Sequence, residues 1–343
     1  MARGRRILIL HTGGTLGMVG KRPSPLKPGR FVQTLRVAVP ELWRIADVDL
    51  DIFSNLDSSD MRPSLWSALA RRVHDALRTY DGVVVTHGTD TMAWTASALS
   101  FMLAGLRKPV VLTGSQRPLS EVRNDARLNL IDAVTAAASG PAEVSICFDS
   151  RLYRGNRARK IKINEYDAFE SANFPPLGFL GVNTVFAEGR RPGGPFRLFP
   201  ELEPRVFLLK IFPGLSAQIA RTLLPGLKGL VVEAFGAGNF PIEGDDSLLP
   251  LFDEAKERGI PVIMVSQARH NAVDLTMYES GAAALARGVL GGGDLTPEAA
   301  VCKLMHVLAR AKTHAEAMKL MRADLAGEWT AAMKPSGRGT PAR

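Results

Sequence analysis

The sequence of 343 residues is long enough for two ordinary domains, and its 46% hydrophobic and 22% charged residues are typical of a soluble globular protein. No apolar stretch reaches the length that a membrane helix needs, which argues against a membrane protein. The 43 basic and 34 acidic residues give a net charge of +9, and because the excess is scattered we interpret it as a general surface property rather than a nucleic-acid site.

The N-terminal region begins with a short apolar run, Ile7–His11, directly before a glycine loop. This run is too short for the core of a signal peptide, and no small-residue cleavage site follows it. We expect it to form a first buried strand in a cytoplasmic protein.

Short apolar runs alternate with longer helical patterns in the first half of the chain. This alternation predicts parallel strands covered by helices on both faces and joined by right-handed crossovers. We therefore expect an α/β fold, with a doubly wound, mostly parallel sheet in an N-terminal domain of residues 1–188. The expected strands are Ile7–His11, Val48–Phe53, Gly82–Thr86, Pro109–Thr113 and Glu143–Phe148, and the expected helices are Pro63–Thr79, Thr91–Ala104 and Val122–Ser139.

A stretch rich in glycine and proline interrupts this pattern, and we interpret residues 189–205 as a linker. The alternation then resumes and predicts a smaller α/β domain over residues 206–330. Its expected elements are Val206–Ile211, Leu215–Leu224, Leu230–Phe235, Asp245–Arg258, Pro261–Ser266 and Thr296–Ala311. Residues 331–343 are basic and rich in Gly and Pro, and we expect a disordered tail.

Cysteine and histidine show no pattern of a metal centre or a disulfide framework. Cys147 and Cys302 stand far apart among apolar residues, and the six histidines are not closely paired. We expect buried core cysteines, no metal and no cofactor.

The loop Thr12–Met18 follows the first expected strand, and ligands bind outside the carboxyl ends of parallel strands. The loop is not a nucleotide phosphate loop, because it lacks the G-x-G-x-x-G spacing and three prolines between residues 23 and 28 prevent a prompt helix start. We infer that its glycines present Thr15 to a small substrate. The proline-rich residues 19–29 would then form a mobile flap.

The segment Asp57–Met61 is the second candidate. An ordinary helix start before Pro63 explains the residues next to that proline. It leaves Asp57 and Ser58 unexplained, because they stand too early in the chain to cap the helix.

The segment Thr86–Met92 lies between a buried strand and a long helix. A helix N-cap at Thr89 or Asp90 is as good an explanation of its polar residues as a functional role. His87 has no evident partner, and we interpret it as structural.

Two later segments complete the candidates. Thr113–Pro118 has the composition of a plain turn, although its backbone could donate hydrogen bonds to a developing oxyanion. The basic run Asn156–Lys162 is typical of a solvated face, but a lysine beside buried carboxylate and hydroxyl groups is a recurrent means of tuning a proton acceptor.

These segments resemble the bacterial-type L-asparaginases. Thr12–Met18 and His87–Met92 look like the two signatures of that family, and Asp57–Met61 and Arg151–Arg157 are similar to its cytoplasmic, type I branch. The resemblance extends from about residue 7 to about residue 328. It implies two α/β domains, L-asparagine as the substrate, and a homodimer or a dimer of dimers, with neither a nucleic acid nor a membrane as a partner.

The resemblance also implies site residues. Thr15 is the expected nucleophile, whose attack on the amide carbon gives an acyl-enzyme and ammonia, and Thr89 with Lys160 then activates water. Which threonine attacks first stays open. The implied catalytic residues are Thr15, Thr89, Asp90 and Lys160, and the implied substrate-binding residues are Asp57, Ser58, Thr89, Asp90 and Ser115.

The sequence departs from the family in two places. Many members have a flap tyrosine that helps to activate the first threonine. Here the flap has none, so either Ser24 or a water replaces it, or Thr15 is activated differently. Some type I enzymes have an allosteric asparagine site built partly from an arginine and a cysteine. Glu233 and Ala268 stand at those positions here, which predicts that this allostery is absent or altered.

Three alternatives stay open. The chain could be a glutaminase-asparaginase, because one methylene discriminates between substrates by only about 1–3 kcal/mol. It could be an ammonia-supplying amidotransferase subunit, although the start of the first strand at Ile7 argues against the extra N-terminal domain of such subunits. It could also be a catalytically silent amino-acid binding protein.

Overall fold

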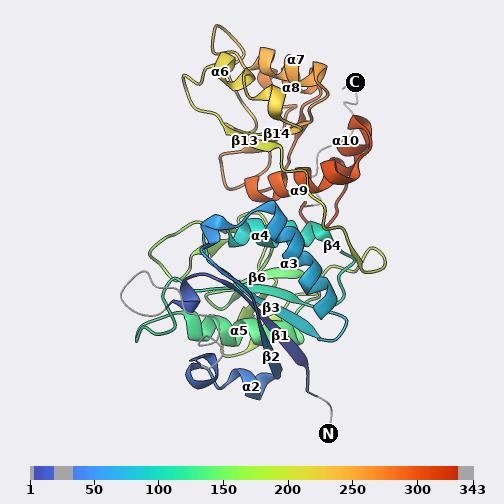
Figure 1. Ribbon diagram of the computed structural model, residues 1–343. Helices are drawn as coiled ribbons and strands as arrows, with labels where there is room; N and C mark the ends of the chain where they lie inside the picture. The colour runs from blue at the N-terminus through green and yellow to red at the C-terminus, as the bar shows by residue number, and fades with distance from the viewer. Residues whose placement is uncertain (1–3, 19–33, 331–343) are drawn as a thin grey trace. The chain divides into compact units, whose positions relative to one another are not determined.

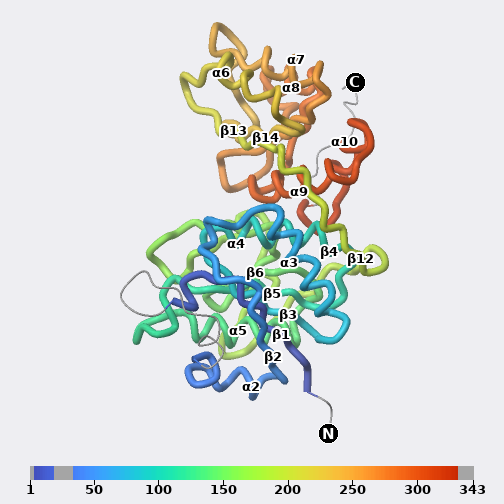
Figure 2. Tube along the Cα trace, viewed as in Figure 1, coloured from blue at the N-terminus to red at the C-terminus, as the bar shows by residue number. Residues whose placement is uncertain are grey.

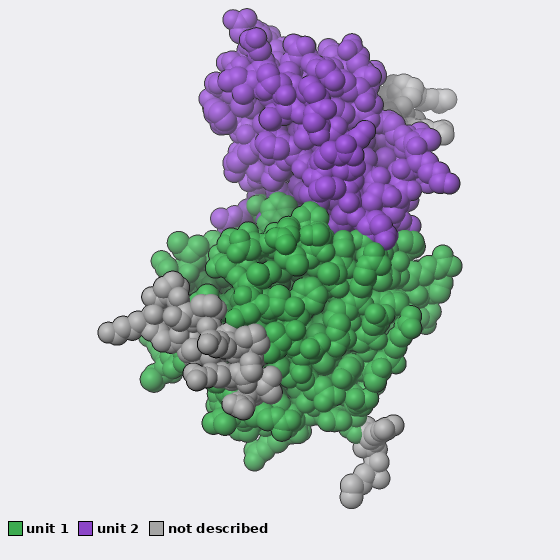
Figure 3. Space-filling model, viewed as in Figure 1, with its two compact units in different colours: residues 1–200 green, residues 201–343 purple. Residues whose placement is uncertain are grey.

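The computed structural model describes residues 4–18 and 34–330, and the chain divides into two compact units between Pro200 and Glu201 (Figure 3). The expected flap, including Ser24, and the expected basic tail lie outside the described residues. None of the helices in the described ranges combines the length and the apolar character that a membrane span requires.

An eight-stranded sheet forms the centre of unit 1, in the order β11-β10-β7-β6-β5-β3-β1-β2 (Figure 1). Neighbours from β6 to β2 are parallel, whereas β7, β10 and β11 are antiparallel to their neighbours. The strands are β1 (Arg6–Gly13), β2 (Asp47–Leu56), β3 (Gly82–Thr86), β5 (Val110–Thr113), β6 (Val144–Phe148), β7 (Arg151–Arg154), β10 (Gly178–Leu180) and β11 (Thr184–Phe186). The prediction of a mostly parallel sheet is confirmed.

Helices cover both faces of this sheet. One face packs on α2 (Leu42–Ile45) and α5 (Ala126–Ser139), and the other lies toward α3 (Pro63–Ala76) and α4 (Met92–Met102) (Figure 1). Because side chains alternate along a strand, Ile7 and Ile9 of β1 share a core cluster with Leu130 of α5. Two short 3-10 turns, η1 (Thr15–Gly17) and η2 (Ser58–Asp60), follow β1 and β2.

Two small sheets complete unit 1. In one, β8 (Arg159–Lys160) pairs with β9 (Phe169–Glu170); in the other, β4 (Leu103–Ala104) pairs with β12 (Arg197–Leu198), as the trace in Figure 2 shows. The amide of Phe199 also donates to the carbonyl of Met102 at 2.9 Å. Residues 197–199 of the segment predicted as a linker, 189–205, are therefore bound to unit 1.

Unit 2 has a parallel sheet of its own, in the order β13-β14-β15-β16. A separate core cluster joins β13, β14 and β15 to the first three helices of the unit, while α9 contacts the same three strands. The strands are β13 (Val206–Lys210), β14 (Gly229–Ala234), β15 (Val262–Ser266) and β16 (Leu290–Gly291). The helices are α6 (Ala217–Arg221), α7 (Leu249–Glu257), α8 (Glu279–Ala286), α9 (Pro297–Arg310) and α10 (His314–Arg322), with a 3-10 turn η3 (Leu224–Gly226).

Candidate active site

The loops after β1 and β3 touch through their glycines. His11 pairs with Thr86 in the sheet, so both loops leave it at the same level. A Cβ atom on Gly14, whose φ is 87°, would lie 2.5 Å from the backbone nitrogen of Gly88. Only glycine permits this approach. Thr15 and Thr89 each directly follow one of the two touching glycines, so the packing brings their loops together.

The third loop joins the same point. A Cβ atom on Gly88 would lie 2.7 Å from the Cβ and Oγ atoms of Ser58, which is buried. The hydroxyl of Thr91 donates to the carbonyl of Ser58 at 2.7 Å. Three segments that are far apart in the sequence therefore form one continuous surface.

Lys160 provides the positive charge at this point. Its Nζ atom donates to Oγ1 of Thr89 at 2.7 Å and to Oδ1 of Asp90 at 2.6 Å. Thr89 is buried and the Lys160 side chain is 15% exposed, whereas the Asp90 side chain is 69% exposed. An ammonium beside a buried hydroxyl favours an oxyanion there, and the carboxylate offsets its charge. The interpretation of this basic run as a solvated face is therefore wrong at Lys160.

The same contacts remove the capping explanation for Thr89 and Asp90. The N-cap of α4 is Thr91, and neither preceding residue occupies that position. The alternative that Thr89 or Asp90 caps the helix is wrong, because the Asp90 carboxylate lies on Lys160 instead.

As expected, Asp57 does not cap the helix that begins at Pro63, whose N-cap is Arg62; it caps a shorter turn instead. It is the N-cap of η2, and its carboxylate accepts from the amide and the hydroxyl of Ser59 at 2.9 and 2.6 Å. The hydrogen bond from the Ser59 hydroxyl lowers the pKa of Asp57 most, and the hydrogen bond from the Ser59 amide lowers it further. The exposed carboxylate is therefore an anion at neutral pH.

A carboxylate at the start of α5 anchors the loop around Ser115. The two oxygens of Asp125 accept from the amides of Gln116 and Arg117 at 2.9–3.1 Å, and burial raises the pKa of Asp125. Ser115 is 1% exposed, and its hydroxyl has no hydrogen-bond partner among the residues that the structure describes. The Gln116 side chain, which no sequence pattern singled out, accepts a hydrogen bond from the Thr89 hydroxyl at 3.3 Å.

His87 lies beneath the loop that carries Thr89 and is fully buried. Its Nδ1 atom lies 2.7 Å from the carbonyl of Gly88, and its Nε2 atom lies 2.9 Å from Oγ1 of Thr95, which accepts from Nε1 of Trp66 at 2.9 Å. Burial lowers the pKa of His87 to about 4, so the ring is neutral. A carbonyl can only accept, which places the single ring proton on Nδ1. The expectation that His87 has no partner is wrong, but its contacts are those of a structural residue.

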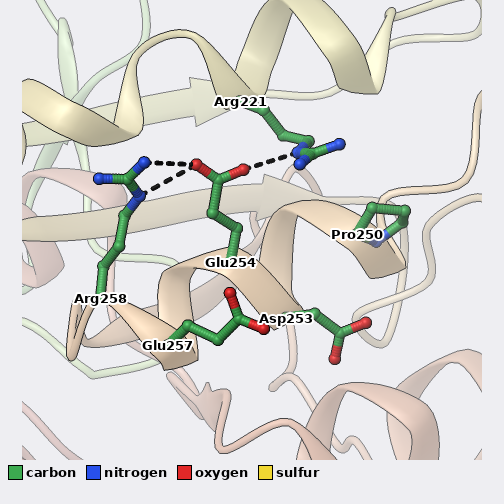
Figure 4. A pocket seen from close by; sticks show the side chains of 6 residues that line it. All are labelled: Arg221, Pro250, Asp253, Glu254, Glu257 and Arg258. Atoms are coloured by element: carbon green, nitrogen blue, oxygen red, sulfur yellow. Dashed lines mark hydrogen bonds and ion pairs between the residues drawn. The ribbon is translucent and has the colours of Figure 1, made fainter.

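A charged hollow on unit 2 contains none of the residues that the sequence singled out (Figure 4). Glu254 accepts from Arg221 at 2.7 Å and from Arg258 at 2.9 Å. Asp253 pairs with Arg287 at 2.9 Å. Exposed ion pairs of this kind contribute little to stability, and we assign the hollow no role.

Comparison with known proteins gives matches along nearly the whole chain. Residues 6–191 match the family model "Asparaginase, N-terminal", and residues 205–321 match "Glutaminase/Asparaginase C-terminal domain". The chain is 38% identical to L-asparaginase 1 of Escherichia coli (strain K12) over 336 residues, which cover 95% of this chain and 98% of the relative.

The chain is also similar to a solved L-asparaginase structure and to a subunit of an amidotransferase. The crystal structure of L-asparaginase I from Vibrio cholerae superposes with a TM-score of 0.87 at 36% identity, covering 96% of this chain and all of that one. A glutamyl-tRNA(Gln) amidotransferase subunit of Pyrococcus furiosus is 36% identical over 350 residues, which cover 96% of this chain and 78% of the relative.

Proposed function

The chain belongs to the asparaginase family and resembles its type I members, and from this premise we propose that it hydrolyses the side-chain amide of L-asparagine to L-aspartate and ammonia. One observation carries the proposal. The Lys160 ammonium binds the Thr89 hydroxyl and the Asp90 carboxylate together, directly beside the glycines that bring the Thr15 loop to the Thr89 loop.

In the first step of the proposed reaction, Oγ1 of Thr15 attacks the amide carbon. The carbon–nitrogen bond breaks, the threonine proton goes to the departing nitrogen, and ammonia leaves an aspartyl ester on Thr15. We assign the first attack to Thr15, because the Thr89 hydroxyl is held by Lys160 and Gln116.

In the second step, water attacks the ester carbon and releases L-aspartate, and its proton returns to Thr15. Thr89 with Lys160 orients and activates this water, since the ammonium stabilises negative charge on the oxygens beside it. Asp90 holds the lysine in place through the ion pair.

The substrate's amino-acid end needs anions and hydrogen-bond donors. We assign the α-ammonium to the carboxylates of Asp57 and Asp90, with each charge-assisted contact stabilising the complex by about 1.5–3 kcal/mol. We assign the α-carboxylate to Ser58, and the buried hydroxyl of Ser115 is available to a substrate oxygen. As for type I members, we propose that the protein acts in the cytoplasm as a homodimer or a dimer of dimers.

A glutaminase activity is the second candidate, and the match of residues 205–321 to the model "Glutaminase/Asparaginase C-terminal domain" favours it. The extra methylene of glutamine moves the reacting carbon farther from the α-ammonium. Discrimination in the range of about 1–3 kcal/mol would leave measurable turnover of both amides.

Ammonia release from L-asparagine, L-glutamine and D-asparagine, measured side by side, tests the proposal. We expect turnover of L-asparagine, weaker turnover of L-glutamine, and little of D-asparagine because its α-groups cannot reach Asp57 and Ser58 in the same pose. Saturable binding of L-asparagine without ammonia release would instead identify a silent binding protein.

A further inference from the structure

We propose that Gln116 is a positioning residue that fixes the direction of the Thr89 hydroxyl proton, an inference that rests on the proposed function of Thr89. Gln116 has an intermediate exposure and lies between Thr89 and the chain that follows Lys160. Neither the family resemblance nor the sequence pattern gave this side chain a role.

The contacts on its far side determine the orientation of the Gln116 amide. Its Nε2 atom lies 3.4, 3.2 and 3.0 Å from the backbone carbonyls of Lys162, Ile163 and Glu165. All three are acceptors, so the nitrogen must face them, and an amide turned the other way would set its oxygen against all three. The Oε1 atom is therefore the one that meets Thr89.

This orientation assigns the proton on Thr89. Amide oxygen only accepts, so the Thr89 hydroxyl donates to Oε1 of Gln116 at 3.3 Å. The hydroxyl has no second proton, so Lys160 is the donor in its 2.7 Å contact with Thr89. One lone pair of the Thr89 oxygen is left for substrate or water.

The Gln116 backbone is fixed as well. Its amide donates to both oxygens of Asp125, at 3.1 and 2.9 Å, and Asp125 also accepts from the Asn129 side chain. The side chain thus ties the loop 162–165 to the Thr89 hydroxyl from a rigid base. Loss of the amide would free both the proton on Thr89 and the chain that follows Lys160.

Two substitutions test the assignment by opposite effects on the pH profile of kcat. Gln116→Met keeps the shape and removes the acceptor, which makes the Thr89 hydroxyl easier to deprotonate and moves the profile to lower pH. Gln116→Glu places an anion beside Thr89, which moves the profile to higher pH. For both variants we expect kcat to fall about tenfold to a hundredfold, with KM for L-asparagine within about twofold of the wild-type value.

Gln267→Met is the matched control. The Gln267 amide also donates to backbone carbonyls, those of Ile211 and Glu233 at 2.7 and 2.9 Å, but it lies in unit 2. We expect this control to keep the wild-type pH profile. Circular dichroism checks the fold of each variant. If Gln116→Glu does not fold, the direction of the pH-profile shift in Gln116→Met tests the assignment by itself.

Wild-type ammonia release separates the two claims. If the wild type releases no ammonia from L-asparagine, the proposed function fails. If the wild type is active and the folded Gln116 variants keep its pH profile, shift it in the same direction, or change KM alone, the Gln116 assignment is overturned while the function stands.

Discussion

A neutral histidine supports the peptide that leads into Thr89. The ring of His87 donates to the Gly88 carbonyl and accepts from Thr95, which in turn holds Trp66 of α3. Since the pKa of His87 is lowered to about 4, the ring keeps this single-proton arrangement at neutral pH. Its role is to position Gly88, and through it Thr89, rather than to transfer protons.

This role predicts different results for two amide replacements of His87. The nitrogen of asparagine in His87→Asn stands near the Nδ1 position and keeps the bond to Gly88, whereas glutamine in His87→Gln extends toward Thr95. We expect kcat to stay within about tenfold of wild type for His87→Asn and to fall about a hundredfold for His87→Gln, as misplacement near reacting groups does. Equal losses in steady-state ammonia assays of both variants would contradict the role.

The proposed site residues were easier to single out in the sequence than the side chains that contact them. Thr15, Thr89 and Lys160 stand in segments whose composition is unusual after a strand, so the sequence singles them out. Gln116 does not stand out, because the carbonyls it binds lie 46 to 49 residues further along the chain and leave no local pattern. Residue propensity also placed the N-cap of α4 at Thr89 or Asp90, whereas the structure has it at Thr91. All three are acceptable cap residues, and tertiary contacts decide among them.

At the scale of elements, buried strands and long helices were predictable and short strands were not. Strands β1, β3, β5 and β6 of unit 1 are largely apolar runs, and their predicted and observed ranges nearly coincide. The edge strand β2 alternates apolar with acidic residues and extends beyond its predicted end to Leu56. Strand β8, which carries Lys160, has two residues, too few for any periodicity. Helix α5 begins at Ala126 rather than at the expected Val122, because Asp125 is engaged with the loop of Gln116 and Arg117.

The contact between α5 and the β6–β7 turn predicts a pH effect on stability. Asp132 accepts from the Ser150 hydroxyl at 2.9 Å, and burial raises the pKa of Asp132 to about 6 from 3.8. The folded protein therefore holds this proton between pH 3.8 and about 6 while the unfolded chain loses it, so the contribution of Asp132 to stability falls as pH rises through that window.

The variant Asp132→Asn removes this titration. The difference in free energy of unfolding, variant minus wild type, should be about 1–3 kcal/mol larger at pH 7 than at pH 4. Urea denaturation at both pH values measures the change, and the exposed Asp245→Asn is the control. A difference from wild type that is the same at both pH values would rule out the raised pKa.

At the scale of the molecule, each unit has its own sheet and core, so each has its own determinants of stability. In unit 2 the ammonium of Lys303 lies 2.6 Å from the carboxylate of Glu328, and both side chains are 0% exposed. Lys303 also donates to the carbonyls of Met321 and Ala323 at 2.9 and 2.6 Å. This buried pair holds the chain after α10 on α9.

Loss of one partner of the pair should destabilise unit 2 strongly. Glu328→Ala leaves the Lys303 charge buried without its carboxylate, and we expect a loss of about 3–5 kcal/mol in the free energy of unfolding. The double variant Lys303→Met with Glu328→Leu should recover part of it, because neither charge remains although the carbonyls that Lys303 bound lose their donor. Hydrogen exchange of the α9 amides shows whether the loss of stability is located in unit 2. The control Glu254→Gln breaks exposed ion pairs only and should change the free energy of unfolding little (Figure 4). A single variant as stable as wild type would contradict the prediction.

The central claim concerns the two threonines whose loops meet through Gly14 and Gly88. Ammonia release from saturating L-asparagine by wild type, Thr15→Ala and Thr89→Val tests it most directly, with circular dichroism to confirm that each variant is folded. We predict that each substitution lowers kcat by on the order of a thousandfold or more. Ammonia release near the wild-type rate from either folded variant would contradict it.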